Sequence, residues 1–333
     1  MAKQFKVMRV DRAGSSVKMV EEAEELAKVN AEVSGVDCNT EDEIIEVAKD
    51  ADAITTGAAQ ITRRVLEALP KCKVIVRYGV GFDTIDVDAA TDNGVVVVNV
   101  PDLFPEEVSN HAIALLLACA KKMVPFNNLM KQGRWADAKR IQSPMVSIYD
   151  QTLGLIGCGN LGRLTARKAQ CFSLKTIGYD PYVDKSLAEK HGITIVSLPE
   201  LLKESDYISV HTLLSEETFH LIGENELKQM KPTAYFINTS RGPVVDEAAI
   251  IKALQENWIA GAGLDVFEKE PIDADNPLLK LDNVIVTPHS AFYSDASAKQ
   301  VRIRVGQEIA SVLTGRWPKN VVNKGVKPKV NLA

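Results

Sequence analysis

Three residues whose side chains can do chemistry follow apolar runs that are typical of buried strands. Arg241 lies in NTSRGPVVD, Glu270 in GAGLDVFEKEP and His289 in NVIVTPHSAF. A guanidinium can bind a carboxylate through two parallel hydrogen bonds and polarise a neighbouring carbonyl. A carboxylate beside an imidazole favours the protonated ring, which can then act as a proton donor or acceptor. Brought together, these side chains could bind an oxo acid and exchange a proton with it.

Each of these residues also has an ordinary structural explanation. An arginine between a serine and a glycine is by default a solvated surface group, and so is a glutamate in the charged run FEKEP. His289 could cap a helix, lie satisfied in a core or bind a metal. Metal binding is disfavoured because no second histidine or cysteine lies nearby at ligand spacing. Which of these roles is correct therefore depends on the other residues that lie near the same side chains.

A glycine pattern, GCGNLG, directly follows a strand-like run and opens a helical one. Such glycines allow a tight turn and let backbone N–H groups at a helix N-terminus approach a pyrophosphate. The pattern alone is weak, because the chain has 20 glycines. Its expected cofactor-binding residues are Gly157, Gly159, Asn160, Leu161 and Gly162.

Asp180 ends the next strand-like run. It follows the glycine pattern at the ~20-residue spacing of a carboxylate that binds the adenosine ribose. Its structural alternative is a simple Asp-Pro turn. A carboxylate at this place repels a 2′-phosphate, and Pro181 and Tyr182 supply no arginine to bind one. Lys185 is the nearest cation that follows in the sequence. The pattern favours NAD over NADP.

Polar residues cluster at the carboxyl ends of the other strand-like runs, which is the edge where open parallel sheets bind ligands. Some of them could instead cap helices. We expect this group to bind the cofactor, with Asp265 and the Thr239-Ser240 backbone orienting its nicotinamide end. The group consists of His211, Thr212, Thr239, Ser240, Asp265 and Ser290.

Short apolar runs alternate with amphipathic stretches along the chain, which is typical of βαβ units with a parallel sheet. The first series is FKVMRV, AEVSGV, DAITT, KVIVRYGVG and GVVVVNVP. The second covers residues 152–157, 175–180, 206–212, 234–240, 260–267 and 283–289, and indicates a doubly wound dinucleotide-binding sheet. We also expect a long helix over about residues 109–131. A helix over about residues 297–314 is expected to pack back on the first domain.

The composition excludes several classes of protein. A net charge of -5 argues against nucleic acid as the main partner, because phosphate binding needs clustered cations. The 5 cysteines are scattered without a CxxC pair, which indicates neither a disulfide framework nor a metal site. The most apolar run, residues 112–120, is shorter than the ~20 residues of a membrane-spanning helix. The first residues contain no apolar core of signal-peptide length. We expect a cytoplasmic protein.

Taken together, these stretches resemble the D-isomer-specific 2-hydroxyacid dehydrogenase family over nearly the whole chain. The similar motifs are GCGNLG with Asp180, NTSRGPVVD, GAGLDVFEKEP and TPHSA, and VRYGVGFDTID resembles the family's substrate loop. Within the family, GFDTID, AFYSDAS and LTGRWPKNVVNKGV are similar to the branch that contains the C-terminal-binding proteins. Glyoxylate, hydroxypyruvate and phosphoglycerate enzymes are close relatives of that branch.

The resemblance implies an α/β fold with two Rossmann-like domains. Residues 1–104 and 293–333 would form a flavodoxin-like substrate domain, and residues 105–292 an inserted, doubly wound NAD-binding domain. It further implies a homodimer built largely by the NAD-binding domain and a catalytic trio of Arg241, Glu270 and His289. The implied substrate-binding residues are Tyr78, Val80, Gly81, Arg241 and His289.

The activity implied is hydride transfer between NADH and C2 of a small 2-oxo acid, such as glyoxylate or hydroxypyruvate. A D-3-phosphoglycerate dehydrogenase is the alternative within the family. An alternative of another class is an NAD(H)-sensing scaffold that binds protein partners, as in the branch named above. The intact Arg, Glu and His favour an enzyme over a scaffold.

Overall fold

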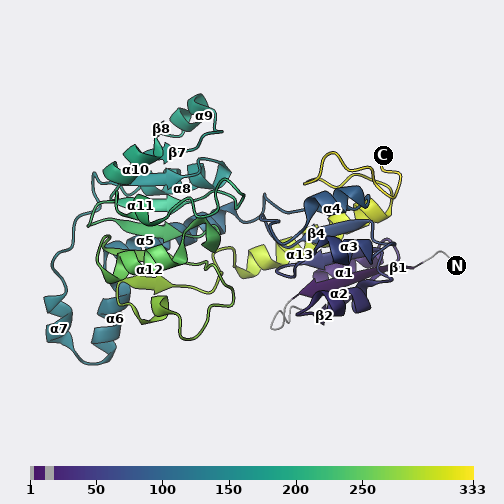
Figure 1. The fold of residues 1–333 in the computed structure, drawn as a ribbon, viewed down its shortest axis with the longest axis horizontal. Helices are drawn as coiled ribbons and strands as arrows, with labels where there is room; N and C mark the ends of the chain where they lie inside the picture. Colours follow the sequence, from purple (N-terminus) through teal and green to yellow (C-terminus); the bar gives the residue numbers. More distant parts are fainter. Residues whose placement is uncertain (1–3, 12–18) are drawn as a thin grey trace. The chain divides into compact units, whose positions relative to one another are not determined.

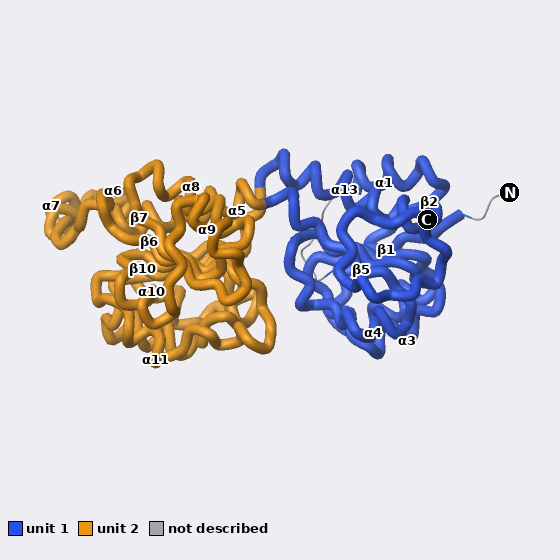
Figure 2. Tube along the Cα trace, turned by 90° about the horizontal axis from the view of Figure 1, so that it is seen from above, with its two compact units in different colours: residues 1–104, 294–333 blue, residues 105–293 orange. Residues whose placement is uncertain are grey.

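The computed structural model describes residues 4–11 and 19–333. The chain divides into two compact units, coloured separately in Figure 2: unit 1 is residues 1–104 and 294–333, and unit 2 is residues 105–293. The boundary after Tyr293 lies one residue beyond the position expected from the sequence. The expectation about an export signal concerns the start of the chain, which lies partly outside the described residues.

Unit 1 contains a parallel five-stranded sheet in the order β2-β1-β3-β4-β5, which is the flavodoxin-like order. The five apolar runs of the first series form these strands, and helices between them provide the crossovers that parallel pairing requires. The strands are β1 (Phe5–Asp11), β2 (Ala31–Asp37), β3 (Ala53–Thr56), β4 (Val74–Arg77) and β5 (Val96–Val98). The helices are α1 (Val20–Ala27), α2 (Glu41–Ala48), α3 (Arg63–Glu67), α4 (Val87–Asp92) and α13 (Asp295–Leu313).

Helix α13 completes unit 1 by packing against α1. Gly306 allows a close approach, because a Cβ added there would lie 2.8 Å from the Cβ of Glu25. Arg302 binds the Glu21 carboxylate at 2.8 Å. These contacts confirm that the C-terminal helix packs on the first domain, and they explain why this unit is discontinuous in sequence.

Unit 2 contains a parallel seven-stranded sheet in the order β12-β11-β10-β9-β6-β7-β8. The strand order reverses between β6 and β9, and this reversal marks the crevice where doubly wound sheets bind ligands. The fold is therefore the α/β class with a Rossmann-like second unit, as predicted. The strands are β6 (Thr152–Ile156), β7 (Lys175–Tyr179), β8 (Ile193–Ile195), β9 (Tyr207–Val210), β10 (Tyr235–Asn238), β11 (Gly261–Leu264) and β12 (Val284–Val286).

Helices cover both faces of this sheet (Figure 1). Because side chains alternate along a strand, Leu155 packs in one apolar cluster with α5 and α8, and Ile156 packs in the other with α10 and α12. The helices of unit 2 are α5 (Pro105–Ala120), α6 (Met123–Lys131), α7 (Trp135–Arg140), α8 (Asn160–Gln170), α9 (Lys185–Lys190), α10 (Leu198–Glu204), α11 (Glu224–Leu227) and α12 (Glu247–Gln255). Two 3₁₀ turns, η1 (Gly242–Val244) and η2 (Pro277–Lys280), complete the unit.

Strand β8 was not predicted from the sequence. Its run of three residues, ITI, pairs only with β7 at the edge of the sheet. A strand this short carries too little periodicity to be recognised without its partner.

The single long helix expected over residues 109–131 is wrong. The structure has two helices, α5 and α6, joined through Lys122 in a left-handed conformation with φ 48°. Pro125 explains the break, because it has no N–H to donate to the carbonyl four residues earlier but is tolerated in the first turn of α6. None of the described helices is by itself long and apolar enough to span a membrane; α5 and α6 reach that length only together, and they are bent by 63°.

Candidate active site

Three loops at the carboxyl edge of the unit 2 sheet carry the residues of the trio. Arg241 follows β10, Glu270 follows β11 and His289 follows β12, and these strands are neighbours. Nδ1 of His289 lies 2.6 Å from Oε2 of Glu270. Oε1 of the same carboxylate accepts a 3.0 Å hydrogen bond from the backbone N–H of Phe267. Both oxygens of Glu270 are therefore held, and Nε2 remains as the ring atom of His289 for proton exchange.

The surroundings of Glu270 favour its ionised form. Burial acts to raise the pKa of Glu270, but the hydrogen bond and charge of His289, the Phe267 N–H and the charge of Arg241 together lower it. The effect of Arg241 places its guanidinium within electrostatic reach of this carboxylate. The side chains of His289 and Glu270 are 36% and 35% exposed, so solutes can reach the pair. The geometry suits acid–base chemistry beside a cation.

The loop that carries His289 is built around the Asp265 carboxylate. His289 has φ 52°, a left-handed conformation that non-glycine residues adopt rarely and at a cost of ~1–2 kcal/mol. Its N–H donates to the Asp265 carbonyl at 2.8 Å. The Asp265 carboxylate accepts from the Ser290 N–H at 2.9 Å, the Ala291 N–H at 2.8 Å and the Thr287 hydroxyl at 2.5 Å. These bonds hold the histidine in its strained conformation.

Asp265 and Ser290 are both among the residues predicted to bind the cofactor. The Asp265 side chain is 0% exposed, and both of its oxygens serve the loop. Ser290 contributes its N–H to the same carboxylate. The structure thus gives these residues a shaping role, and contact with a cofactor stays a prediction for both.

His111, which was not predicted from the sequence, belongs to the same network. Its Nε2 lies 2.9 Å from the Thr287 hydroxyl and 3.5 Å from Oδ1 of Asp265. His111 is on α5, beside the apolar run that begins at residue 112. A histidine within such a helix was the one available signal, and its partners lie too far away in sequence to be inferred.

Asn238, also missed, fixes the backbone that presents Arg241. Its buried side chain donates to the Arg241 carbonyl at 2.9 Å and accepts from the Ser240 N–H at 3.0 Å. Gly242 then allows the loop after β10 to approach the loop after β11, since an added Cβ would lie 1.9 Å from the Phe267 carbonyl carbon. This close approach explains how Arg241 comes near Glu270.

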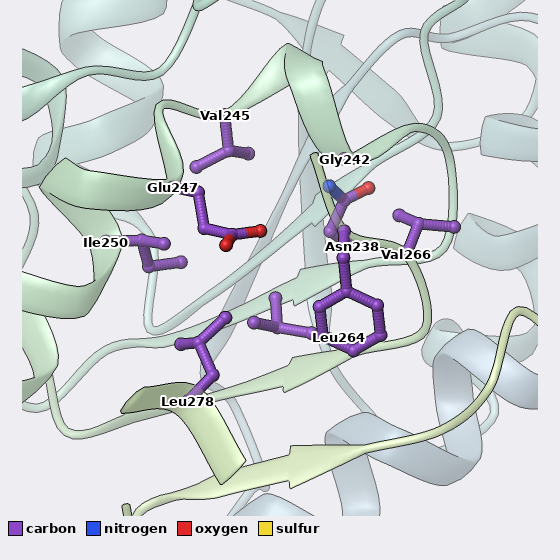
Figure 3. Close-up of a pocket in the computed structure, with 9 residues that line it drawn as sticks. Asn238, Gly242, Val245, Glu247, Ile250, Leu264, Val266 and Leu278 are labelled. Atoms are coloured by element: carbon purple, nitrogen blue, oxygen red, sulfur yellow. The ribbon is translucent and has the colours of Figure 1, made fainter. Parts of the chain in front are cut away.

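A small pocket lies beside Gly242, the residue that follows Arg241 (Figure 3). None of the trio lines it, and most of its walls are aliphatic, so it does not suit a charged oxo acid. It belongs to the packed interior beneath the loops that follow β10 and β11. The lining residues are Asn238, Gly242, Val245, Glu247, Ile250, Leu264, Val266, Phe267 and Leu278.

The glycine turn between β6 and α8 has the geometry of a phosphate cradle. Gly157 has φ 95°, and a Cβ there would lie 2.8 Å from the His211 backbone. A Cβ on Gly162 would lie 2.2 Å from the Gly157 carbonyl oxygen, so both positions require glycine. At Gly159, by contrast, no described atom lies within 4 Å of an added Cβ. Helix α8, which begins at Asn160, has no side chain capping its N-terminus. The helix therefore presents, side by side, open space and N–H donors that no side chain of the described residues caps.

Asp180 stands beside this turn, after β7. Its Oδ2 accepts from the Cys158 N–H at 2.8 Å, and its Oδ1 accepts from the N–H groups of Tyr182 at 2.9 Å and Val183 at 3.1 Å. The turn-forming role weighed in the sequence analysis is thus present. Each carboxylate oxygen has two acceptor sites, so Oδ2 can also accept a ribose hydroxyl.

The residues after β9 and β10 form the opposite wall of the crevice. Burial lowers the pKa of His211 to about 4, so the ring is neutral, with Nε2 3.0 Å from the Ser209 hydroxyl. The Ser240 hydroxyl donates to the Thr212 carbonyl and joins the two loops. Nδ1 of His211 and the hydroxyl of Thr239 are buried without a hydrogen-bond partner among the described residues.

These observations fit a dinucleotide. Buried polar atoms without partners, an uncapped helix N-terminus and open space at Gly159 are what a polar ligand with a pyrophosphate would fill. NAD would be held by the glycine turn and by Asp180.

The other predicted substrate residues lie in unit 1, in the loop after β4. The Tyr78 hydroxyl donates to the Glu22 carboxylate and lies 3.1 Å from the Thr55 hydroxyl, so it is held inside unit 1. Val80 is 37% exposed, and its carbonyl accepts from Asn99 at 2.7 Å. Gly81 is buried. The predicted contact between Tyr78 and the substrate therefore involves its backbone rather than its hydroxyl.

The chain is similar to known dehydrogenases over most of its length. Residues 113–291 match the family described as D-isomer specific 2-hydroxyacid dehydrogenase, NAD binding domain. The chain is 42% identical over 288 residues to a glyoxylate reductase of Korarchaeum cryptofilum (strain OPF8), covering 85% of this chain and 86% of that protein. It is 40% identical over 314 residues to a D-3-phosphoglycerate dehydrogenase of Methanocaldococcus jannaschii, covering 93% of this chain but 59% of that protein.

Two solved structures carry ligands that bear on the cofactor. A D-lactate dehydrogenase from Aquifex aeolicus, complexed with NAD and lactic acid, has a TM-score of 0.81 and 30% identity, covering 95% of this chain and 99% of the other. The acyclic imino acid reductase Bsp5, complexed with NADPH and D-Arg, has a TM-score of 0.82 and 31% identity, covering 96% and 100%. Similar chains therefore bind either form of the cofactor.

Proposed function

The chain belongs to the D-isomer-specific 2-hydroxyacid dehydrogenase family, NAD-dependent oxidoreductases that act on CH–OH groups, and we propose that it interconverts NADH plus a small 2-oxo acid with the 2-hydroxy acid. Glyoxylate and hydroxypyruvate are the proposed substrates. The observation that carries the proposal is the 2.6 Å pair of His289 and Glu270 beside Arg241 in unit 2.

In the proposed reaction, Arg241 binds the substrate carboxylate and polarises its 2-oxo group. NADH, when bound, supplies the hydride that reduces C2. His289 gives the proton on Nε2 to the developing alkoxide, and Glu270 stabilises the charged imidazole before that transfer. In the reverse direction the neutral ring removes the hydroxyl proton. The loop of Tyr78, Val80 and Gly81 is proposed to contact the carboxylate through its backbone.

A spectrophotometric panel tests this function. We expect NADH oxidation with glyoxylate or hydroxypyruvate, and a smaller rate with pyruvate. Preference for phosphohydroxypyruvate would instead favour the D-3-phosphoglycerate dehydrogenase alternative, which the relative in M. jannaschii supports. Tight NADH binding with no turnover of any 2-oxo acid would favour the NAD(H)-sensing scaffold.

We further propose that the protein is a homodimer assembled through α6 and α7, which project from the rest of unit 2 (Figure 1, Figure 2). Helix α6 buries no residue within the chain. Large apolar side chains are exposed along this arm, with Met123 at 59%, Met130 at 44% and Trp135 at 62%. An exposed apolar patch of this kind is typical of an interface. Light scattering should give twice the mass of 36.4 kDa, and Trp135→Glu should shift it toward the monomer.

The proposed location is the cytoplasm. All five cysteines are free in the structure, four of them buried. Unpaired thiols are typical of a reducing compartment.

A further inference from the structure

Two exposed side chains of unit 2 are linked across the dinucleotide crevice. The hydroxyl of Tyr182, in the loop after β7, donates to the carboxylate of Glu217, in the loop after β9. Strand β6 lies between β7 and β9 in the sheet. The link therefore crosses the carboxyl end of β6, where the glycine turn presents its phosphate cradle.

Both ends of this link are anchored. The Tyr182 N–H donates to Asp180, whose other oxygen accepts from the N–H of Cys158 in the glycine turn. Glu217 lies in a turn that Thr218 closes, because the Thr218 hydroxyl accepts from the Ser215 N–H at 2.8 Å and donates to the Leu213 carbonyl at 2.6 Å. A continuous chain of bonds thus joins the two carboxylates, Asp180 and Glu217, through one tyrosine.

The electrostatics of Tyr182 show that both carboxylates act on the same place. The hydrogen bond to Glu217, and then its charge, raise the pKa of the Tyr182 phenol, and the charge of Asp180 raises it further. Two cations are also near in sequence. Arg163 donates to the Cys158 carbonyl at 2.9 Å, and Lys185 begins α9. Neither has a hydrogen bond to Asp180 or Glu217 among the described contacts.

We propose that Glu217, positioned by Tyr182, is a specificity-determining residue that selects NADH over NADPH. The inference rests on the proposed NADH-dependent function and deepens it. Asp180 accepts hydrogen bonds from the ribose hydroxyls, as NADH allows. NADPH places a doubly charged 2′-phosphate on that ribose, and Glu217 adds a second negative charge against it. NADH carries no charge at this position, so Glu217 affects its binding little.

The test is direct binding of cofactor to Glu217→Gln. We expect NADPH affinity to rise on the order of three- to tenfold, the size of one charge acting on a phosphate through largely aqueous medium. NADH affinity should change less than twofold, and the NADPH gain should shrink in high salt. Glu216→Gln is the matched control, since it removes the same charge one residue earlier. It should leave the NADPH to NADH ratio nearly unchanged.

Two further measurements separate this inference from the proposed reaction. Titration with ADP and 2′-phospho-ADP reads the adenosine end alone, so it stays informative even if no 2-oxo acid is reduced. In a Tyr182→Phe background, Glu217→Gln should have a smaller effect, because the carboxylate is no longer held in place. Equal changes for NADH and NADPH, an equal effect of Glu216→Gln, or no change in either affinity would overturn the proposal.

Discussion

Nδ1 of His289 faces Oε2 of Glu270 at 2.6 Å, although the two residues lie in loops that follow different strands. The histidine is in a left-handed conformation, and the buried Asp265 carboxylate secures its loop. A strained residue with several fixed contacts is typical of a functional site. The proposed roles of His289, Glu270 and Arg241 can each be tested by a separate substitution.

Replacing His289 with glutamine should remove the proposed proton donor and leave the cofactor site intact. We expect kcat for 2-oxo acid reduction to fall about 10²- to 10⁴-fold, the usual contribution of a general acid. NADH affinity, measured by fluorescence titration, should remain within about twofold of the original. Loss of NADH binding together with turnover would show that His289 is a structural residue.

Glu270→Gln should change the pH dependence of reduction. The lowered pKa of Glu270 means that its carboxylate is ionised at neutral pH and favours the charged imidazole. Without that charge, the decline of kcat/KM at alkaline pH should begin at lower pH. Glu268→Gln is a matched control, because Glu268 lies in the same segment as Glu270 and forms a comparable 2.6 Å pair with His220. If the alkaline decline of kcat/KM moves equally in both variants, or moves in neither, Glu270 has no part in the mechanism.

The same pair should affect stability in a defined pH window. A carboxyl whose folded pKa is lowered stabilises the fold above its ordinary pKa, and this contribution is lost as pH falls through the lowered value. The melting temperatures of the original protein and Glu270→Gln should therefore differ most near neutral pH. The difference should narrow on acidification, as differential scanning calorimetry can measure. A difference in melting temperature that widens on acidification would contradict this prediction.

Arg241→Lys keeps the positive charge but loses the planar pair of donors. We expect kcat/KM for the 2-oxo acid to fall about 10- to 100-fold, with much of the change in KM, because a lysine cannot bind a carboxylate bidentately. NADH affinity serves as the control and should hold. Unchanged kinetics would mean that Arg241 does not contact the substrate.

Thr287→Val should loosen the loop that carries His289. The valine is similar in shape but removes the hydroxyl that donates to Asp265 and contacts His111. We expect the free energy of unfolding to drop by about 1–2 kcal/mol, the size of one lost hydrogen bond to a buried carboxylate, and kcat to fall with it. Thr287→Ser retains the hydroxyl and should restore both quantities. If the serine variant behaves like the valine variant, the hydrogen bonds are not the cause.

Two glycines of the cradle should respond differently to alanine. At Gly159 an added Cβ meets no described atom and φ is -64°, so Gly159→Ala should fold normally but weaken NADH binding more than tenfold by blocking the pyrophosphate. At Gly162 the Cβ would lie 2.2 Å from a carbonyl oxygen, so Gly162→Ala should lower the melting temperature. Thermal unfolding with and without NADH distinguishes the two effects. Full NADH affinity in Gly159→Ala would place the cofactor elsewhere.

Local patterns predicted much of the architecture. Strand-like runs of both series appear as strands, because alternating βαβ segments have short-range periodicity that the sequence displays directly. The exceptions depend on neighbours or on a single residue. Strand β8 exists through pairing with β7, and the break before α6 follows from Pro125 and the left-handed Lys122.

The sequence by itself determined the parallel α/β organisation, the glycine turn and the types of side chain at the carboxyl ends of the strands, since each depends on residues close together in the chain. Only the tertiary structure decided which partners these side chains have. It joined His289 to Glu270, turned the Asp265 carboxylate inward to the histidine loop, added His111 and Asn238, and held the Tyr78 hydroxyl inside unit 1. The physical reason is that a hydrogen bond forms between groups a few ångströms apart, and the strand order that sets those distances is a property of the whole sheet.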